Sequence, residues 1–98
     1  MSPVDVLLLT QARCDFCDGA KALFERLGSD FELRVSELDL RSPDGRRIAE
    51  SHGVLFAPGI LLDGELVSYG RPSERRLRSE LCMRFVKPDR IPRQSVVD

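Results

Sequence analysis

The feature that most restricts the fold is a pair of cysteines, Cys14 and Cys17, placed between two different hydrophobic patterns. Residues 4–9, just before the pair, form an almost continuous apolar run, which is typical of a strand covered on both faces. After the pair, apolar residues recur at the spacing of one buried helix face, which predicts a helix over residues 14–27. The two thiols are therefore expected where a buried strand passes into the first turn of a helix.

Turn signals divide the segment that follows this helix. Gly28 is predicted to end the helix in the left-handed conformation that glycine tolerates. Residues 31–40 then alternate apolar and polar side chains, which indicates a second strand. Residues 42–45 (Ser-Pro-Asp-Gly) are typical of a turn, and residues 46–52 are predicted to form a short helix.

The second half of the chain is predicted to contain a hairpin and a last helix. Residues 60–62 and 65–69 are two expected strands, and the Asp-Gly pair at residues 63–64 between them is a strong hairpin signal. Ser73 is a suitable N-cap for a helix that reaches about residue 85. The predicted order of elements is therefore β-α-β-α-β-β-α.

This order indicates an α/β fold with a mixed four-stranded sheet and helices on both faces. A strand–helix–strand unit implies a right-handed crossover and parallel pairing, whereas the hairpin makes the last pair antiparallel. The 98 residues are enough for one buried core. Residues 1–86 are predicted to form that domain, and residues 87–98, with two prolines among polar residues, a flexible C-terminal tail.

The spacing of the two cysteines indicates dithiol–disulfide chemistry. On the first turn of a helix, Cys17 lies beside Cys14 within reach of a disulfide bond. A helix N-terminus stabilises a thiolate, the reactive form of cysteine, so Cys14 is the predicted nucleophile and Cys17 the predicted resolving thiol. Arg13 adds positive potential beside the nucleophile, whereas Asp15 and Asp18 oppose it.

Taken together, these features resemble the thioredoxin fold, and within it the small glutaredoxin-like and thioredoxin-like proteins. The resemblance covers most of residues 4–85. It rests on the strand that enters the Cys-x-x-Cys pair, on Pro58 at the start of the third strand, and on the hairpin followed by Gly70. It implies that Pro58 has a cis peptide bond and faces Cys14, and that the Ala57 backbone pairs with an extended substrate.

The resemblance also implies a function, a thiol–disulfide oxidoreductase that reduces protein disulfides or glutathione mixed disulfides. Glutathione is the candidate reductant, with thioredoxin reductase as the alternative, and no bound cofactor is expected. The predicted substrate-binding residues are Arg13, Phe16, Ala57, Pro58, Tyr69 and Gly70. Phe16 has two open interpretations, a solvent-facing contact for substrate or the first core residue of its helix.

Two other classes of function remain open. The first is metal binding, because four residues of the chain are of types that bind zinc, namely Cys14, Cys17, His52 and Cys82. An iron–sulfur cluster shared between subunits is a related alternative. Since His52 and Cys82 lack paired spacing, no metal site is predicted; His52 is interpreted as a surface residue and Cys82 as a partly buried structural cysteine. The second class is a non-catalytic adaptor domain.

Composition and charge limit the partners and the compartment. The formal net charge of −1 gives no general attraction to nucleic acid or to an anionic membrane. Basic residues concentrate in residues 71–98, with 8 basic and 4 acidic side chains, which we interpret as a solvated surface. The apolar run is too short for a signal peptide or a membrane span, so a cytoplasmic monomer is expected.

Overall fold

The computed structural model describes residues 3–85, and the predicted order of elements is confirmed. The elements are β1 (Val4–Thr10), α1 (Asp15–Leu27), β2 (Leu33–Asp39), α2 (Pro43–His52), β3 (Gly59–Leu62), β4 (Glu65–Tyr69) and α3 (Glu74–Phe85). The predicted tail, residues 87–98, lies outside the described residues, so the predicted division into domain and tail stays a prediction.

The four strands form one mixed sheet in the order β2-β1-β3-β4. The β1 strand pairs parallel with β2, and β3 pairs antiparallel with β4, as the sequence predicts. The β1 strand also pairs antiparallel with β3, a pairing that the sequence did not predict. The β3–β4 hairpin turns at Asp63 and Gly64, whose φ angles of 50° and 83° are those of a tight two-residue turn. The central position of β1 explains its almost continuous apolar sequence, because both of its faces are covered.

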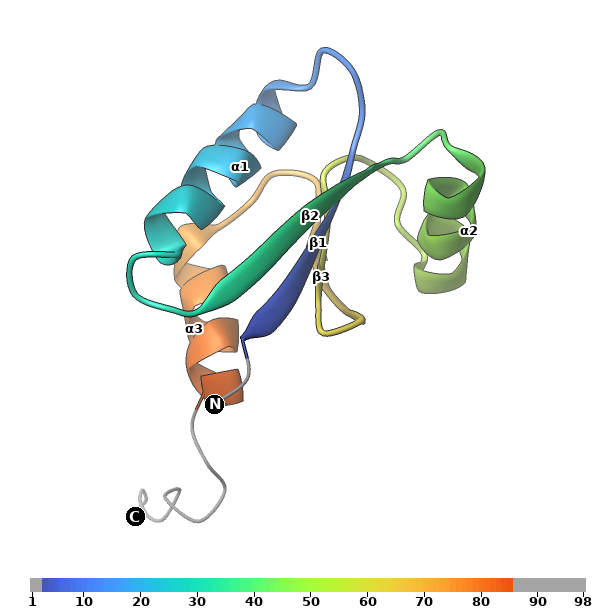
Figure 1. Cartoon of the computed structure of the whole chain (residues 1–98). Coiled ribbons are helices and arrows are strands. Elements are labelled where there is room, and N and C mark those ends of the chain that lie inside the picture. Colours follow the sequence, from blue (N-terminus) through green and yellow to red (C-terminus); the bar gives the residue numbers. More distant parts are fainter. Residues whose placement is uncertain (1–2, 86–98) are drawn as a thin grey trace.

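Helices cover both faces of the sheet (Figure 1). Helices α1 and α3 lie on one side and α2 on the other. The core on the α1 and α3 side consists of Val4, Val6, Leu8, Leu23, Phe24, Leu27, Ile60, Leu62, Val67, Leu77 and Leu81. The smaller core on the α2 side consists of Leu9, Ala49, Val54 and Leu61. Burying each large aliphatic side chain contributes about 1.5–3 kcal/mol, so the larger cluster supplies most of the packing energy.

Two predictions about helix ends are wrong. Residues 42–45 do not form a separate turn but begin α2: the Ser42 hydroxyl oxygen accepts a hydrogen bond from the Gly45 N–H at 3.0 Å, and Pro43 occupies the first turn. Serine followed by proline suits both a turn and a helix start, so composition alone does not separate them. Gly28 ends α1 in the right-handed conformation, with φ −63°, and it is Gly53 after α2 that is left-handed.

The α3 helix is tied to α1 by an exposed cluster of charges. Glu74, the first residue of α3, forms ion pairs with Arg26 of α1 and with Arg78 one turn along α3. Hydrogen bonds from Arg78 and then Arg26 lower the pKa of Glu74. Exposed ion pairs of this kind contribute little to stability, so the position of α3 depends mainly on its buried residues Leu77 and Leu81.

Ser73 is the N-cap of α3, as predicted, and its contribution is measurable. Its hydroxyl oxygen accepts a hydrogen bond from the Arg76 N–H at 3.2 Å. We expect Ser73→Ala to lower the free energy of unfolding by about 1 kcal/mol in urea denaturation, because that N–H loses its partner. Ser73→Asn, which keeps an acceptor oxygen, is the matched control. Equal stabilities for the two variants would show that the cap contributes nothing.

Candidate functional site

The cysteine pair forms the N-terminal end of α1. Cys14 is the N-cap residue, with extended backbone angles, and Cys17 lies in the first turn. Their sulfur atoms are joined in a disulfide, and their Cα atoms are 5.1 Å apart. The Cys14 sulfur also accepts a hydrogen bond from the Cys17 backbone N–H at 3.1 Å. This N–H is one of the groups that a helix leaves unpaired at its start, so the helix end is directed at the Cys14 sulfur.

The two cysteines differ in exposure. Cys17 is only 2% exposed and belongs to the buried face of α1, whereas Cys14 is half-buried. A molecule approaching from solvent therefore has access to Cys14 rather than to Cys17. The arrangement suits an outer thiol that reacts with a partner and an inner thiol that reacts only with its neighbour.

The connection that precedes Cys14 has an uncommon backbone conformation. Arg13 has a φ of 55°, in the left-handed region that few residues other than glycine adopt. Its side chain is exposed, as are Gln11 and Ala12 before it. Residues held in this region are frequent at functional sites, where the surrounding structure determines the backbone. Here the conformation lies in the turn between the end of β1 and the N-cap of α1.

Pro58 and Gly70 meet at the same end of the sheet as the cysteines. Leu9 near the end of β1 pairs with Gly59 at the start of β3, which places Pro58 beside the point where the chain leaves for Cys14. The Ala57–Pro58 peptide bond is cis, and the Gly70 N–H donates to the Pro58 carbonyl at 2.9 Å. Ala57 and Pro58 are themselves buried. Contact of Pro58 with Cys14, and substrate pairing at Ala57, stay predictions.

Exposed apolar side chains lie on the segments around this end of the sheet. Phe16 is 50% exposed, which favours the solvent-facing interpretation over a core position. Leu55 and Phe56, in the loop before Pro58, are 70% and 62% exposed, and the Phe56 ring lies 5.9 Å from that of Tyr69. Leu55 and Phe56 are not among the predicted substrate-binding residues, although two large apolar side chains outside any helix or strand pattern indicate such a surface.

Cys82 and His52 do not join the cysteine pair. Cys82 is exposed, so its interpretation as a partly buried structural residue is wrong. It follows Leu81, but one residue turns a helix by about 100°, away from the buried Leu77 and Leu81 row. His52 is a surface residue, as predicted, and its ring nitrogens contact the carbonyls of Ile48 and Gly64. Between residues 3 and 85, no three side chains of His, Cys, Asp or Glu gather as metal ligands.

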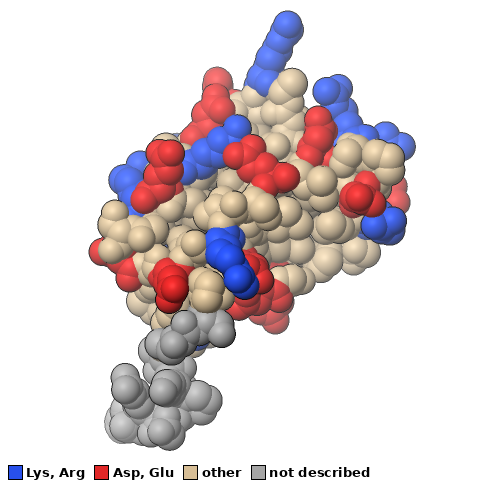
Figure 2. All heavy atoms as spheres, in the orientation of Figure 1, with Lys and Arg blue, Asp and Glu red and all other residues tan. Residues whose placement is uncertain are grey.

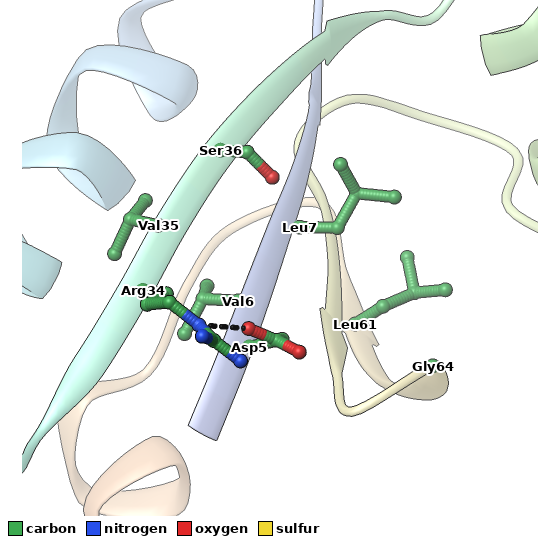
Figure 3. A pocket seen from close by; sticks show the side chains of 8 residues that line it. All are labelled: Asp5, Val6, Leu7, Arg34, Val35, Ser36, Leu61 and Gly64. Carbon is green, nitrogen blue, oxygen red and sulfur yellow. Dashed lines mark hydrogen bonds and ion pairs between the residues drawn. The ribbon is translucent and has the colours of Figure 1, made fainter. Parts of the chain in front are cut away.

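A separate hollow of about 370 Å³ lies at the other end of the sheet (Figure 3). Its floor includes Leu7 and Leu61, and an ion pair between Arg34 and Asp5 of 2.8 Å crosses its edge. The hydrogen bond that the Arg34 guanidinium donates to the Asp5 carboxylate raises the pKa of Arg34. Neither cysteine lines this hollow, so it is not part of the candidate site.

Among the described helices, none is long and apolar enough to cross a membrane.

The fold and the cysteine pair define the class of protein. The chain is an α/β protein of the thioredoxin fold, with a Cys-x-x-Cys pair at the start of its first helix. It is a distant homologue of thioredoxin: it is 25% identical over 77 residues to thioredoxin from Methanocaldococcus jannaschii, covering 79% of this chain and 91% of the relative. No protein-family model matches the sequence.

Solved structures support the same fold. A thioredoxin variant from Halobacterium salinarum superposes with a TM-score of 0.61 at 23% identity, over 82% of this chain and 73% of that one. Mitochondrial thioredoxin 3 from Saccharomyces cerevisiae, in its oxidized form, gives 0.63 at 17% identity, over 85% of this chain and 80% of that one. At these identities the structures establish the fold alone.

Proposed function

We propose that the protein is a thiol–disulfide oxidoreductase that reduces disulfides of proteins or mixed disulfides of glutathione. The observation that carries the proposal is the difference between the two thiols: Cys14 caps a helix and is accessible, whereas Cys17 is buried directly behind it. The relationship to thioredoxin supports it.

The proposed reaction has two exchange steps. In the first, the Cys14 thiolate attacks one sulfur of the substrate disulfide, forms a mixed disulfide and releases the other substrate sulfur as a thiolate. In the second, the Cys17 thiolate attacks the Cys14 sulfur, closes the Cys14–Cys17 disulfide and releases the remaining substrate thiolate. Two electrons pass from the protein dithiol to the substrate, and the released thiolates take up protons from water.

Several residues have proposed roles in binding the substrate. The Ala57 backbone, ahead of Pro58, is proposed to pair with an extended substrate segment. Exposed Phe16, with Tyr69 and the adjoining Gly70 turn, is proposed to contact the apolar part of the substrate. The proposed partners are therefore disulfide-containing proteins or glutathione, and the reaction needs no bound metal or cofactor because both thiols come from the chain.

A coupled turnover assay tests the function and identifies the reductant. Insulin and a glutathione mixed disulfide are each offered as substrate in two reductant systems. The first system contains this protein, glutathione and glutathione reductase. The second contains thioredoxin reductase with this protein in place of thioredoxin. We expect NADPH consumption that depends on this protein in one of the two reductant systems. If reduced protein, supplied in stoichiometric amount, fails to reduce either substrate, the proposed activity is wrong.

A further inference from the structure

We infer that Arg13 and Arg41 form a subsite for a carboxylate of the disulfide substrate, beside Cys14. This inference rests on the proposed function and names a feature of the substrates that it prefers. The observation behind it is a hollow of about 450 Å³ lined by Gln11, Ala12, Arg13 and Arg41. Arg13 is the residue that immediately precedes the accessible cysteine.

Two segments far apart in sequence build this hollow. The β1 and β2 strands run parallel, with Thr10 paired to Asp39, so the segments that follow the two strands leave the sheet at the same end. The Leu40 N–H donates to the Thr10 carbonyl at 2.7 Å and extends this pairing by one residue. Arg41 on the turn toward α2 is thereby brought beside the connection from β1 to Cys14. The connection from β1 to α1 lies at the top of the view in Figure 1, and Figure 2, in the same orientation, shows Lys and Arg side chains projecting from this end of the molecule.

The guanidinium groups of this pair are available to an anion. Within residues 3–85, no carboxylate lies within ion-pair distance of Arg13. Arg41 has Asp39 nearby, but the distance from its Nε is 4.0 Å, and the same Asp39 oxygen accepts a hydrogen bond from the Arg41 backbone N–H at 2.7 Å. By contrast, Arg34 and Arg78 hold carboxylates at 2.8 Å.

The chemistry of the hollow selects the ligand. Two guanidinium groups offer cationic hydrogen-bond donors, and the Gln11 side-chain amide has a neutral N–H donor beside its carbonyl acceptor, an arrangement that suits a carboxylate. Asp15 and Asp18 follow Cys14 in the first turn of α1, so a substrate carboxylate is expected on the Arg13 side of the thiol and not over the helix. An acidic side chain next to a protein disulfide and the carboxylates of glutathione are the two sources of this group.

The test uses single-turnover oxidation of the reduced protein by designed disulfides. Two peptides carry one cysteine joined to the same chromogenic aromatic thiol and differ only in flanking residues, which are Glu in one and Gln in the other. Because the aromatic thiol leaves more readily, Cys14 forms its mixed disulfide with the peptide, and release of colour gives the second-order rate constant. A second pair compares glutathione joined to this thiol with the diamide of glutathione.

We expect the wild-type protein to react about two- to fivefold faster with the Glu peptide than with the Gln peptide at low ionic strength. The ratio should approach one in high salt, because the groups are exposed. Arg13→Gln and Arg41→Gln should each reduce the ratio by about half. Arg34→Gln removes the same charge from the opposite end of β2 and should leave the ratio unchanged.

The ratio of the Glu-peptide rate to the Gln-peptide rate tests the carboxylate subsite separately from the proposed function. Any effect of Arg13 on the reactivity of Cys14 changes the rates of both peptides equally and cancels. The rate with the Gln peptide alone reports the proposed function. A lost preference with the peptide pair or with the glutathione pair supports the subsite and identifies the source of the carboxylate. If both ratios in the Arg13→Gln/Arg41→Gln protein equal those of the wild type, the inference is wrong.

Discussion

The Cys14→Ser protein is expected to have no disulfide-reducing activity above the uncatalysed background. A serine hydroxyl is not ionised near neutral pH, so the variant lacks the nucleophile that opens the substrate disulfide. Cys17 does not replace it, because its side chain is buried and only 2% exposed. The measurement is insulin reduction by dithiothreitol, followed as turbidity, with and without the variant.

The Cys17→Ser protein is expected to stop after the first exchange step. The hydrogen bond to the Cys14 sulfur comes from the backbone N–H of residue 17, which the substitution keeps. Attack by Cys14 should therefore proceed at a rate within a few-fold of the wild type, while release of product is lost and the mixed disulfide accumulates. Intact-mass spectrometry should detect one substrate adduct per chain.

The Cys82→Ser substitution, which removes the third thiol of the chain, is the control for both variants. Because Cys82 is exposed on α3, it is the thiol that would carry a nonspecific adduct. The single Cys82→Ser variant should turn over like the wild type, and the adduct of the Cys17→Ser/Cys82→Ser protein should map to Cys14. Full turnover by the Cys14→Ser protein, or an adduct lost together with Cys82, would contradict the assigned roles.

The part of the site that could be predicted is the part encoded locally. The buried strand, the Cys-x-x-Cys pair and the helix follow one another in sequence, and each carries its own signal in hydrophobic spacing or residue type. The exposure of the Phe16 side chain could not be predicted in this way, because a residue in the first turn of a helix faces solvent or core according to small rotations of the helix. The structure places it 50% exposed.

The part that could not be predicted depends on register and on competing local signals. Arg41 reaches the hollow beside Arg13 only because Thr10 pairs with Asp39, and a shift of one residue would place a different side chain there. Cys82 follows a buried leucine, yet its exposure depends on which way α3 is turned. Ser42 illustrates the second difficulty, because the same hydroxyl caps a helix or closes a turn.

Gly45→Ala is expected to destabilise the protein through the turn that carries Arg41. A Cβ atom at position 45 would lie 1.9 Å from the Asp39 carbonyl oxygen, which is backbone and cannot rotate away. That oxygen also accepts hydrogen bonds from the Ser42 N–H at 3.0 Å and the Ser42 hydroxyl at 2.7 Å, so moving it disturbs the start of α2. We expect the free energy of unfolding to fall by about 1–3 kcal/mol in urea denaturation.

Gly19→Ala is the matched control for this prediction, since it makes the same chemical change inside another helix. Gly19 is exposed on α1, and a Cβ atom there would meet no atom within 4 Å. Alanine is the better helix former by about 0.5–1 kcal/mol, so this variant should be more stable than the wild type. Opposite signs for the two substitutions would locate the effect at the contact with Asp39. A stabilised Gly45→Ala protein would mean that this turn is looser than the structure indicates.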